Sequence, residues 1–226
     1  MENNKIVCVI PTYNEELYIE DTIKGLKKTN LIDSIVVVDD GSTDETINLV
    51  EKMDVKLIKL NKNYGKGYAI KKALKAIDFD LLVLVDGDIG VTSYDIKKLI
   101  IPVKAGYTDI AIGRFGKPKK RGGFGLVKAL AKYGVFTLTK HKLNCSLCGQ
   151  RVYKKDAIKN IKYIPNKYGV EIAMTVSALR EGYKIDEIDV NMTHRETERN
   201  ISGFIHRGKQ FINILKTLMV LIYRGE

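Results

Sequence analysis

Two aspartates separated by one glycine, Asp86-Gly87-Asp88, follow an apolar run of strand length at residues 81–85. Such a run predicts a strand buried on both faces, so its end is the first place where a charge can reach solvent. Carboxylates this close together repel each other unless something neutralises them. Mg²⁺ or Mn²⁺ would do so, because these cations prefer oxygen ligands and keep positions open for substrate phosphates. The alternative is that both aspartates are solvated turn residues. The motifs in the rest of the chain have to distinguish these two interpretations.

Two other apolar runs end in polar residues in the same way. Residues 5–10 are followed by Pro-Thr-Tyr-Asn-Glu at 11–15, and residues 34–38 by Asp-Asp-Gly-Ser-Thr-Asp at 39–44. Asn14 is the predicted N-cap of a helix to about residue 28, and Ser42 with Glu45 fits a capping box for a helix to about residue 52. One such segment is usually a capped turn, but three at the strand ends of one sheet indicate a binding site.

The first half of the chain alternates short strands with helices. The predicted strands are residues 5–10, 34–38, 55–60, 81–85 and 109–112, and the predicted helices are residues 14–28, 42–52, 67–77 and 93–103. This order predicts an α/β fold with a Rossmann-like, mostly parallel sheet and helices on both faces, in which ligands bind at the carboxyl ends of strands. The glycine patterns of dinucleotide-binding folds and P-loops are absent from the sequence.

The composition is that of a globular domain, but the charge is unusual. Of 226 residues, 45% are hydrophobic and 29% charged, and the net charge is +11. Such a charge suits nucleotide phosphates, a lipid head-group surface or nucleic acid. We expect no nucleic-acid partner, because the basic residues are scattered and no aromatic residues are interleaved with them for base stacking.

The three cysteines, the lack of a recognisable leader and the lack of an apolar stretch of about 18 residues predict a cytoplasmic protein in a reducing environment. Peripheral contact with the inner face of the membrane is left open. His141 and Cys145-x-x-Cys148 have metal-ligand spacing, but a structural zinc site needs a fourth ligand that the sequence does not offer. Thiols that line an acceptor pocket are the alternative.

Four segments together resemble the family-2 glycosyltransferases of the GT-A fold, in particular their polyprenyl-phosphate branch. They are residues 11–15, 37–44, 63–67 (Asn-x-Gly-Lys-Gly) and 86–88, in the family's order and spacing over the first half of the chain. The resemblance implies a UDP- or GDP-linked sugar donor. The residues that it assigns to the nucleotide sugar are Pro11, Thr12, Tyr13, Glu15, Val38, Asp40, Lys66, Asp86, Gly87, Asp88 and Arg114.

The same resemblance implies that Asp86 and Asp88 hold Mg²⁺ or Mn²⁺ on the donor diphosphate. Asp88 is the better candidate for direct coordination, and Asp86 reaches either the ribose or the metal through water. His194 is similar to a metal-binding histidine in relatives of glucosyl-phosphoglycerate synthase, and is a further candidate metal ligand or phosphate donor. A cation suits the chemistry, because transfer leaves a nucleoside diphosphate whose developing charge has to be neutralised. Asp88 and Glu171 are the predicted catalytic residues.

Glu171 falls where many inverting members carry a general base. A base is needed for a sugar hydroxyl acceptor, whereas a phosphate is already an anion and needs none. The alternative is that Glu171 only stabilises the start of a helix. The predicted contacts to acceptor or phosphate are Gln150 and Arg151, in a segment similar to one that faces the acceptor, and Arg195 and Arg199, since arginine binds phosphate in a bidentate manner.

A polyprenyl phosphate at the membrane surface is the expected acceptor, with a soluble phosphorylated small molecule or a glycan hydroxyl as alternatives. A nucleotidyltransferase also combines paired aspartates with a metal. That class usually has a glycine-rich basic segment after its first strand, where residues 11–15 stand here. Whether transfer inverts or retains the anomeric configuration is left open, because family 2 usually inverts whereas the segment around His194 is similar to retaining relatives.

The second half of the chain is expected to complete one domain. Residues 115–125 are glycine-rich and basic and predict a loop over the site, followed by helices at 126–138 and 168–180 and a strand at 184–190. Residues 204–223 are amphipathic and either pack on the domain, form a homodimer or lie in a bilayer interface. We expect a single GT-A domain over 1–226, with a nucleotide-sugar-binding half (1–113), an acceptor half (114–200) and a C-terminal amphipathic helix (201–226).

Overall fold

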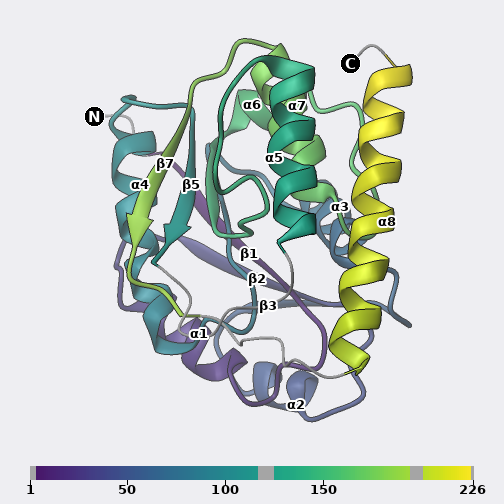
Figure 1. The fold of residues 1–226 in the computed structure, drawn as a ribbon. Coiled ribbons are helices and arrows are strands. Elements are labelled where there is room, and N and C mark those ends of the chain that lie inside the picture. Colours follow the sequence, from purple (N-terminus) through teal and green to yellow (C-terminus); the bar gives the residue numbers. More distant parts are fainter. Residues whose placement is uncertain (1–3, 117–124, 194–200, 225–226) are drawn as a thin grey trace.

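One seven-stranded sheet forms the centre of the computed structural model, which describes residues 4–116, 125–193 and 201–224 (Figure 1). The strands are β1 (Ile6–Thr12), β2 (Ser34–Asp39), β3 (Lys56–Lys59), β4 (Leu81–Leu84), β5 (Ile110–Phe115), β6 (Arg151–Lys154) and β7 (Ile185–Val190). Their order across the sheet is β3-β2-β1-β4-β6-β5-β7, and neighbours are parallel except at β6. The predicted mostly parallel α/β fold is confirmed, and the expected boundary at residue 113 falls within β5.

Strand β6 is the strand that the sequence did not reveal. Its four residues, Arg-Val-Tyr-Lys, are too few and too charged for a hydrophobic period to show. It runs antiparallel to β4 and pairs Arg151 with Leu84, the last residue of β4. Gln150, just before β6, therefore arrives beside the loop that carries Asp86.

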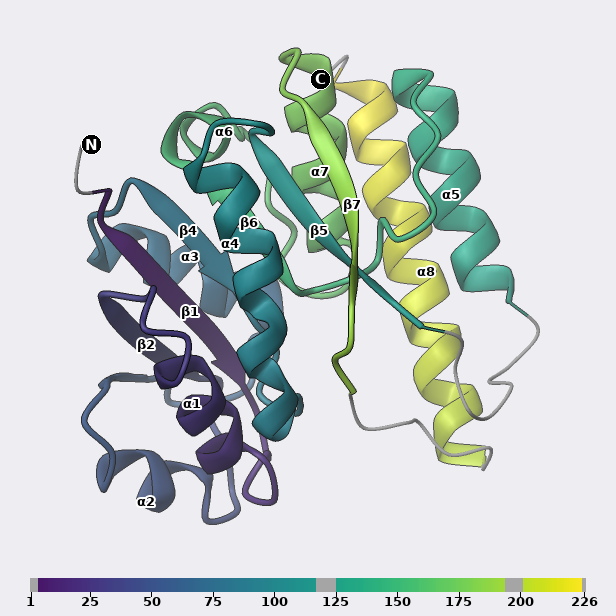
Figure 2. The same cartoon turned by 90° about the vertical axis from the view of Figure 1, so that its left-hand side faces the viewer.

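Helices cover both faces of the sheet (Figure 2). One face carries α1 (Ile19–Lys27), α2 (Thr46–Glu51), the 3₁₀ helix η1 (Gly90–Ile96) and α4 (Lys97–Lys104), and the other carries α3 (Lys66–Ala76), α6 (Lys155–Lys159) and α7 (Val170–Arg180). Helices α5 (Leu126–Thr139) and α8 (Ile201–Tyr223) pack on α7 as a further layer. In the described part of the chain, none of the helices combines the length and hydrophobicity that a membrane span requires.

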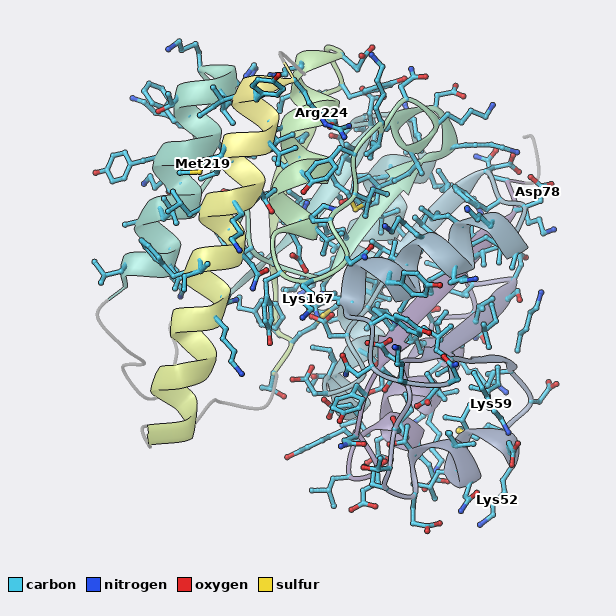
Figure 3. All side chains as sticks on the ribbon, turned by 90° about the vertical axis from the view of Figure 1, so that its right-hand side faces the viewer. Lys52, Lys59, Asp78, Lys167, Met219 and Arg224 are labelled. Atoms are coloured by element: carbon cyan, nitrogen blue, oxygen red, sulfur yellow. The ribbon has the colours of Figure 1, made fainter. Side chains whose placement is uncertain are left out.

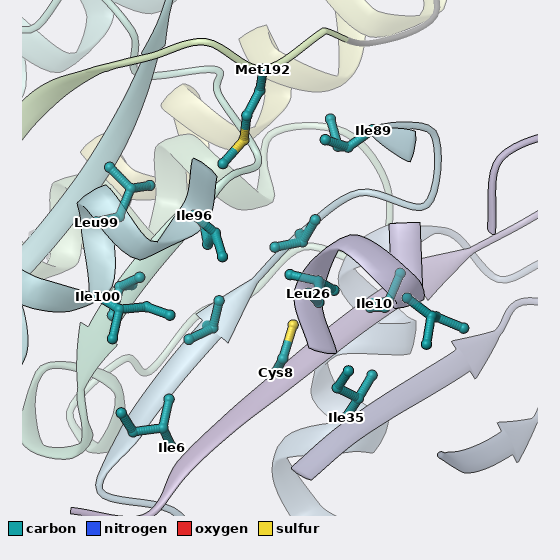
Figure 4. Packing of buried hydrophobic residues seen from close by; sticks show 14 of the residues in the cluster. Ile6, Cys8, Ile10, Leu26, Ile35, Ile89, Ile96, Leu99, Ile100 and Met192 are labelled. Atoms are coloured by element: carbon teal, nitrogen blue, oxygen red, sulfur yellow. The ribbon is translucent and has the colours of Figure 1, made fainter. Parts of the chain in front are cut away.

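Strand β1 shows how the sheet supports a core on each face. All of its residues are buried, and successive side chains point to opposite faces. Ile6, Cys8 and Ile10 therefore join the cluster that includes α1 and α4 (Figure 4), whereas Val7 and Val9 join the cluster that includes α3 and α7. Burial of each large apolar side chain contributes roughly 1.5–3 kcal/mol, so the strand is fixed firmly up to its carboxyl end.

Two predicted helix starts are wrong, and for one reason. Helix α1 begins at Ile19 rather than at Asn14, and α2 begins at Thr46 rather than near Ser42. Asn14 adopts a left-handed backbone conformation (φ 55°), its N–H donates to Ser42 Oγ at 2.9 Å, and its side-chain oxygen accepts from the Thr43 N–H at 2.9 Å. The two expected caps thus bind each other's loops instead of their own helices.

Thr22 of α1 holds the loop that follows β4. Its buried hydroxyl donates to the Gly87 carbonyl and accepts from the Gly90 N–H, both at 2.8 Å. Ser93 Oγ donates to the Thr22 carbonyl at 2.8 Å. The turn between Asp86 and η1 is therefore anchored to a helix on the sheet, which fixes the direction in which its aspartates leave β4.

Replacing Thr22 with valine should destabilise the protein by about 1–3 kcal/mol, because valine keeps the side-chain shape but leaves the Gly87 carbonyl and the Gly90 N–H buried without partners. Urea unfolding followed by far-UV circular dichroism measures the change. Thr22→Ser keeps the hydroxyl and serves as the control. If the valine variant lost no more stability than the serine variant, these hydrogen bonds would not be what holds the loop.

Candidate active site

The carboxyl ends of β1, β2 and β4 lie next to one another in the sheet. The register pairs Thr12 with Asp39 and Val9 with Leu84. The Asp40 N–H donates to the Thr12 carbonyl at 2.8 Å, which continues the pairing beyond β2. The three polar segments at residues 11–15, 39–44 and 86–88 are therefore at one edge of the sheet, as expected for strands of this direction.

An ionic cluster of Lys66, Asp86, Glu171 and Gln150 lies at this edge. Lys66 Nζ is 2.6 Å from Asp86 Oδ1 and 2.7 Å from Glu171 Oε1, so one ammonium group bridges two carboxylates. Gln150 Nε2 donates to Asp86 Oδ2 at 3.1 Å. These side chains come from the start of α3, the loop after β4, the first turn of α7 and the residue before β6, so the cluster exists only in the folded chain.

Lys66 carries a permanent positive charge within this cluster. Only 29% of its side chain and 14% of that of Glu171 are exposed. Burial by itself would lower the pKa of Lys66, but the charges of Asp86 and Glu171 and the hydrogen bonds to them outweigh burial, so the pKa is raised well above its usual range. The start of α7 also favours the Glu171 carboxylate through the helix dipole.

Gly149 packs directly against the ionic cluster. A Cβ at this position would lie 2.3 Å from Asp86 Oδ2 and 2.6 Å from Lys66 Nζ, closer than non-bonded atoms approach. Only a glycine lets the backbone of residue 149 come this near, so any side chain there would push Asp86 and Lys66 out of place. Gly149 belongs to the segment whose sequence is similar to one that faces the acceptor. The structure places it against the carboxylate of Asp86 and the ammonium group of Lys66.

Asp88 lines a cavity of ≈ 340 Å³ that also involves Tyr18, Asp21, Thr92 and Thr193. The Thr193 N–H donates to Thr92 Oγ1 at 3.0 Å, which holds the segment after β7 beside the start of η1. His194 is the next residue in the chain but lies outside the described residues, as do Arg195 and Arg199 and most of the basic loop, residues 117–124.

The donor set at this edge fits a hard divalent cation. Within the described residues, no group of three His, Cys, Asp or Glu side chains could enclose a metal ion. Asp86 and Asp88 supply oxygen ligands only, and Mg²⁺ is usually bound by one or two carboxylates together with substrate phosphates and water. The arrangement suits a cation that arrives with a phosphorylated ligand and does not suit a closed structural site.

Asp39 and Asp40 use their carboxylates differently. Both oxygens of Asp40 accept backbone hydrogen bonds, from the Tyr64 N–H at 2.8 Å and the Gly65 N–H at 2.7 Å. Burial raises the pKa of Asp40 although these two bonds oppose the shift. Asp39 Oδ2 accepts from the Gly41 and Ser42 N–H groups, while Asp39 Oδ1 is buried and has no hydrogen-bond partner among the described residues. Asp40 thus anchors the turn before α3, and the adjacent Asp39, which the sequence analysis left out, has the open acceptor.

The residues predicted around β1 divide into core and site. Val38 is fully buried in the core on the α3 side and Pro11 is also buried, so these two support the edge from within. Thr12 Oγ1 is buried at the edge with no hydrogen-bond partner among the described residues, and a Cβ on Gly87 would lie 2.7 Å from it. The Tyr13 side chain is 43% exposed and can reach a ligand.

Glu15 also lies against the turn after β4. Its Cγ would be 3.2 Å from a Cβ on Gly87, and its N–H donates to Thr46 Oγ1 at 2.8 Å. The loop after β1 is thus fixed both to α2 and to the turn that carries the two aspartates. Gly87 is required here because the loop leaves no room for a side chain.

Arg114 is placed at the carboxyl end of β5 and is paired with Asp189 of β7. Its Nε and Nη2 donate to the two Asp189 oxygens at 2.6 and 2.8 Å. The hydrogen bonds and charge of Asp189 raise the pKa of Arg114, and the same contacts lower that of Asp189. Both side chains are well exposed, so a bound anion could compete for this guanidinium.

Arg151 is buried, and its placement argues against the predicted contact with acceptor or phosphate. Its guanidinium donates to the carbonyls of Ser146, Cys148 and Glu171 and to the hydroxyls of Tyr153 and Thr175, at 2.6–3.2 Å. These acceptors surround a side chain that is only 1% exposed, so the guanidinium is directed into the protein. Arg151 instead fixes the loop before β6 to α7, and thereby positions Gln150.

The cysteines before β6 do not form a zinc site within the described residues. Burial raises the pKa of Cys148 to about 12, and burial followed by the charge of Glu187 raises that of Cys145. Burial thus favours the neutral thiol at both positions. Cys148 Sγ lies 3.3 Å from Gln150 Oε1, beside the ionic cluster.

The model of the family described as Glycosyl transferase family 2 matches residues 7–162, which is more than half of the chain. The chain belongs to this family. The match includes every member of the ionic cluster except Glu171, which lies beyond it. Membership decides between the two enzyme classes that combine paired aspartates with a metal, in favour of glycosyl transfer.

Two relatives match most of this glycosyltransferase. An uncharacterized protein of Methanocaldococcus jannaschii is 29% identical over 232 residues, covering 98% of this chain and 93% of its own. A UDP-N-acetylglucosamine–dolichyl-phosphate N-acetylglucosaminyltransferase of Methanococcus voltae is 29% identical over 185 residues, covering 70% of this chain and 73% of its own. The glycosyltransferase is thus similar to an enzyme that acts on a polyprenyl phosphate.

A solved structure shares the fold of the glycosyltransferase. Glucosyl-3-phosphoglycerate synthase from Mycobacterium tuberculosis, in complex with Mn²⁺, uridine diphosphate and phosphoglyceric acid, matches with a TM-score of 0.80. The match covers 96% of this chain and 78% of the synthase at 22% identity. At this identity the likeness concerns the fold, which is that of the GT-A glycosyltransferases.

Replacing Lys66 with methionine should lower the free energy of unfolding at neutral pH by about 1–3 kcal/mol, because Asp86 and Glu171 would face each other without a cation in a partly shielded site. In the unmodified protein the raised pKa of Lys66 keeps its contribution intact up to its ordinary value of about 10.4, and the contribution is lost as pH rises through the raised value.

Urea unfolding between pH 6 and pH 10 measures the loss, which should stay constant over this range. Lys59→Met is the matched control, because Lys59 and Glu51 form an ion pair with about half of each side chain exposed, and such pairs contribute only about 0–1 kcal/mol. Equal losses in the two variants would contradict the assigned role of the ionic cluster.

Proposed function

We propose that this glycosyltransferase moves a sugar from a UDP- or GDP-linked donor to a phosphorylated acceptor, with Mg²⁺ or Mn²⁺ on the donor diphosphate. The observation that carries the proposal is the common edge of β1, β2 and β4, where Asp86 and Asp88 lie beside the loop after β1 and the ionic cluster. In a mostly parallel sheet, a ligand binds at such an edge.

Two buried polar atoms at this edge are proposed to bind the nucleoside end of the donor. Asp39 Oδ1 and Thr12 Oγ1 are buried at the edge and have no hydrogen-bond partners within the described residues. A buried polar atom without a partner costs roughly 1–3 kcal/mol, which a bound ribose or base hydroxyl or N–H would relieve. The exposed ring of Tyr13 can stack on the base.

The diphosphate end is assigned to the aspartates after β4. Lys66 and Gln150 contact Asp86, and Asp88 lines the cavity beside this edge. Asp88 is the residue proposed to coordinate the metal directly, with His194 as a further ligand. The bound cation would neutralise the charge that develops on the leaving diphosphate. Lys66, Gln150 and Thr22 keep the two aspartates in position, and Arg114 is a candidate for the outer phosphate.

A phosphate acceptor suits the state of Glu171. Its Oε1 atom accepts from the ammonium group of Lys66 at 2.7 Å, so this oxygen is already engaged by a positive partner. A phosphate acceptor requires no proton to be removed, and a net charge of +11 attracts it. A polyprenyl phosphate is the acceptor that we favour, supported by the similarity to the dolichyl-phosphate enzyme. A small soluble phosphate is the second candidate, supported by the fold shared with the phosphoglycerate-dependent synthase.

Asp88→Asn should reduce sugar transfer by about 10²-fold or more, because the amide replaces the charge that holds the cation. It should also abolish the rise in melting temperature produced by a UDP- or GDP-sugar with Mn²⁺, since only a ligand that binds the folded state stabilises it by mass action. Thermal shift with and without Mn²⁺, followed by an assay of nucleoside diphosphate release, measures both.

Asp54→Asn is the control, because this carboxylate is fully exposed and its only described ion pair spans 4.0 Å. The control should behave like the unmodified protein in both assays. Unchanged metal-dependent donor binding in Asp88→Asn would refute the assignment of Asp88, and stabilisation by no nucleotide sugar at all would refute the proposed donor class.

Glu171→Gln separates the acceptor classes. With a phosphate acceptor, kcat should fall less than about 10-fold, whereas with a hydroxyl acceptor the loss of a general base should cost about 10²–10⁴-fold and flatten the acidic limb of the pH profile. Steady-state kinetics with undecaprenyl phosphate, which accepts on its phosphate, and with 3-phosphoglycerate, which offers a free hydroxyl, give the comparison. A large loss of kcat with a phosphate acceptor would contradict the assignment of Glu171 as a partner of Lys66 only.

A further inference from the structure

Helices α5 and α8 form an outer layer on the acceptor side of the molecule. They run side by side on α7 (Figures 1 and 2), and their inner faces share a core of residues from all three helices. The contact between them is close, since a Cβ on Gly134 would lie 2.5 Å from a Leu218 methyl carbon. The layer is therefore part of the fold, and the predicted packing of the C-terminal helix on the domain describes its inner side.

The outer side of this layer is apolar. Its exposed large side chains are Leu126 and Tyr133 of α5 and Ile212, Met219, Ile222 and Tyr223 of α8, each 53–95% exposed. On α8, residues 212, 219 and 223 recur at helical spacing and share one face. Figure 3 shows Met219 where α8 runs beside α5. Several large apolar side chains gathered on adjacent helices mark an interaction surface, unlike single exposed residues.

The same layer is positively charged and has no carboxylates. The sequence contains no Asp or Glu from residue 110 to 155, nor from 199 to 225, and these stretches include the whole of α5 and α8. Lys128 and Lys132 of α5 and Lys209 and Lys216 of α8 are exposed. A surface that combines apolar side chains with lysines and has no carboxylates is complementary to a layer of anionic lipid head groups above hydrocarbon.

We propose that the outer face of α5 and α8 docks on the surface of an anionic lipid bilayer. The apolar side chains enter the boundary between head groups and acyl chains, and the lysines contact lipid phosphates. A protein partner with an apolar patch would account for the exposed side chains, but not for the exclusion of every carboxylate from both helices. Neither helix, within the described residues, is suited to cross the bilayer, so the layer lies on the surface.

This inference deepens the proposed function, because it names the surface that would present a lipid-linked phosphate. Both helices begin at the end of the molecule where β5 and β7 finish, which is the edge that carries the site (Figure 1). Docking of their outer face would therefore bring the acceptor side of the site to the head groups. Binding to vesicles that contain no acceptor does not depend on transfer, so the two proposals can fail separately.

Flotation of the full chain with phosphatidylcholine vesicles, with and without phosphatidylglycerol, tests the proposal. Binding is expected only to the anionic vesicles and should weaken as salt rises. Lys209→Gln with Lys216→Gln should weaken binding about 10- to 30-fold, and Tyr133→Ser with Met219→Ser should also weaken it. Lys24→Gln with Lys28→Gln changes the net charge equally at the C-terminal end of α1, across the sheet, where Lys28 is the C-cap, and Tyr107→Ser removes a tyrosine that is 73% exposed elsewhere; both should bind normally.

The matched variants make the outcomes decisive. No flotation with anionic vesicles, or equal losses in the α8 and α1 lysine pairs, would overturn the proposal. A dimer detected by light scattering that dissociates in the Tyr133→Ser, Met219→Ser protein would also overturn it, because the face would then be a protein interface. Flotation that depends on the α5 and α8 residues in a protein that binds no nucleotide sugar would support docking while refuting the proposed function.

Discussion

The ammonium group of Lys66 is the interaction on which the site depends. It bridges Asp86, which follows the central strand, and Glu171, which opens a helix in the second half of the chain. Two carboxylates brought this close in a shielded place would repel each other strongly, so the helix and the aspartate loop could not share the edge without a cation between them. The start of α3 supplies that cation, which ties the loop after β4 to the first turn of α7 at the edge where the polar segments meet.

Strand β6 runs antiparallel to β4, and this direction lets residues from the second half of the chain contact Asp86. Had β6 run parallel to β4, residue 150 would lie at the opposite edge of the sheet. Because it is antiparallel, the residues that lead into it reach the carboxyl end of β4, where Gly149 packs on Asp86 and Gln150 donates to it. The buried guanidinium of Arg151 fixes this segment, because it donates hydrogen bonds to carbonyls of the loop before β6 and of α7. A short strand and one buried charge thus determine how the aspartates are presented.

Helices α5, α7 and α8 add a layer that the sheet itself does not need. Helix α7 is buried along nearly its whole length, and it is α5 and α8 that cover the side turned away from the sheet. The residues on the inner faces of α5 and α8 are fixed by this packing. The residues on their outer faces are not, and can contact another surface. One pair of helices can therefore belong both to the core, through inner faces that stabilise the fold, and to a surface, through outer faces with exposed lysines and apolar residues.

The sequence by itself determined the fold class, the order of strands and helices in the first half, and the edge at which the polar segments meet. Strands buried on both faces appear as continuous apolar runs, and a carboxylate is tolerated only where such a run ends. It could not locate the start of α1 or α2, because Asn14 and Ser42 bond to each other's loops. Nor could it show that Arg151 is buried, that Asp39 rather than Asp40 has an open oxygen, or that Lys66 bridges two carboxylates, one of them 105 residues away. Those facts depend on strand direction and on packing between distant segments, which only the tertiary structure decides.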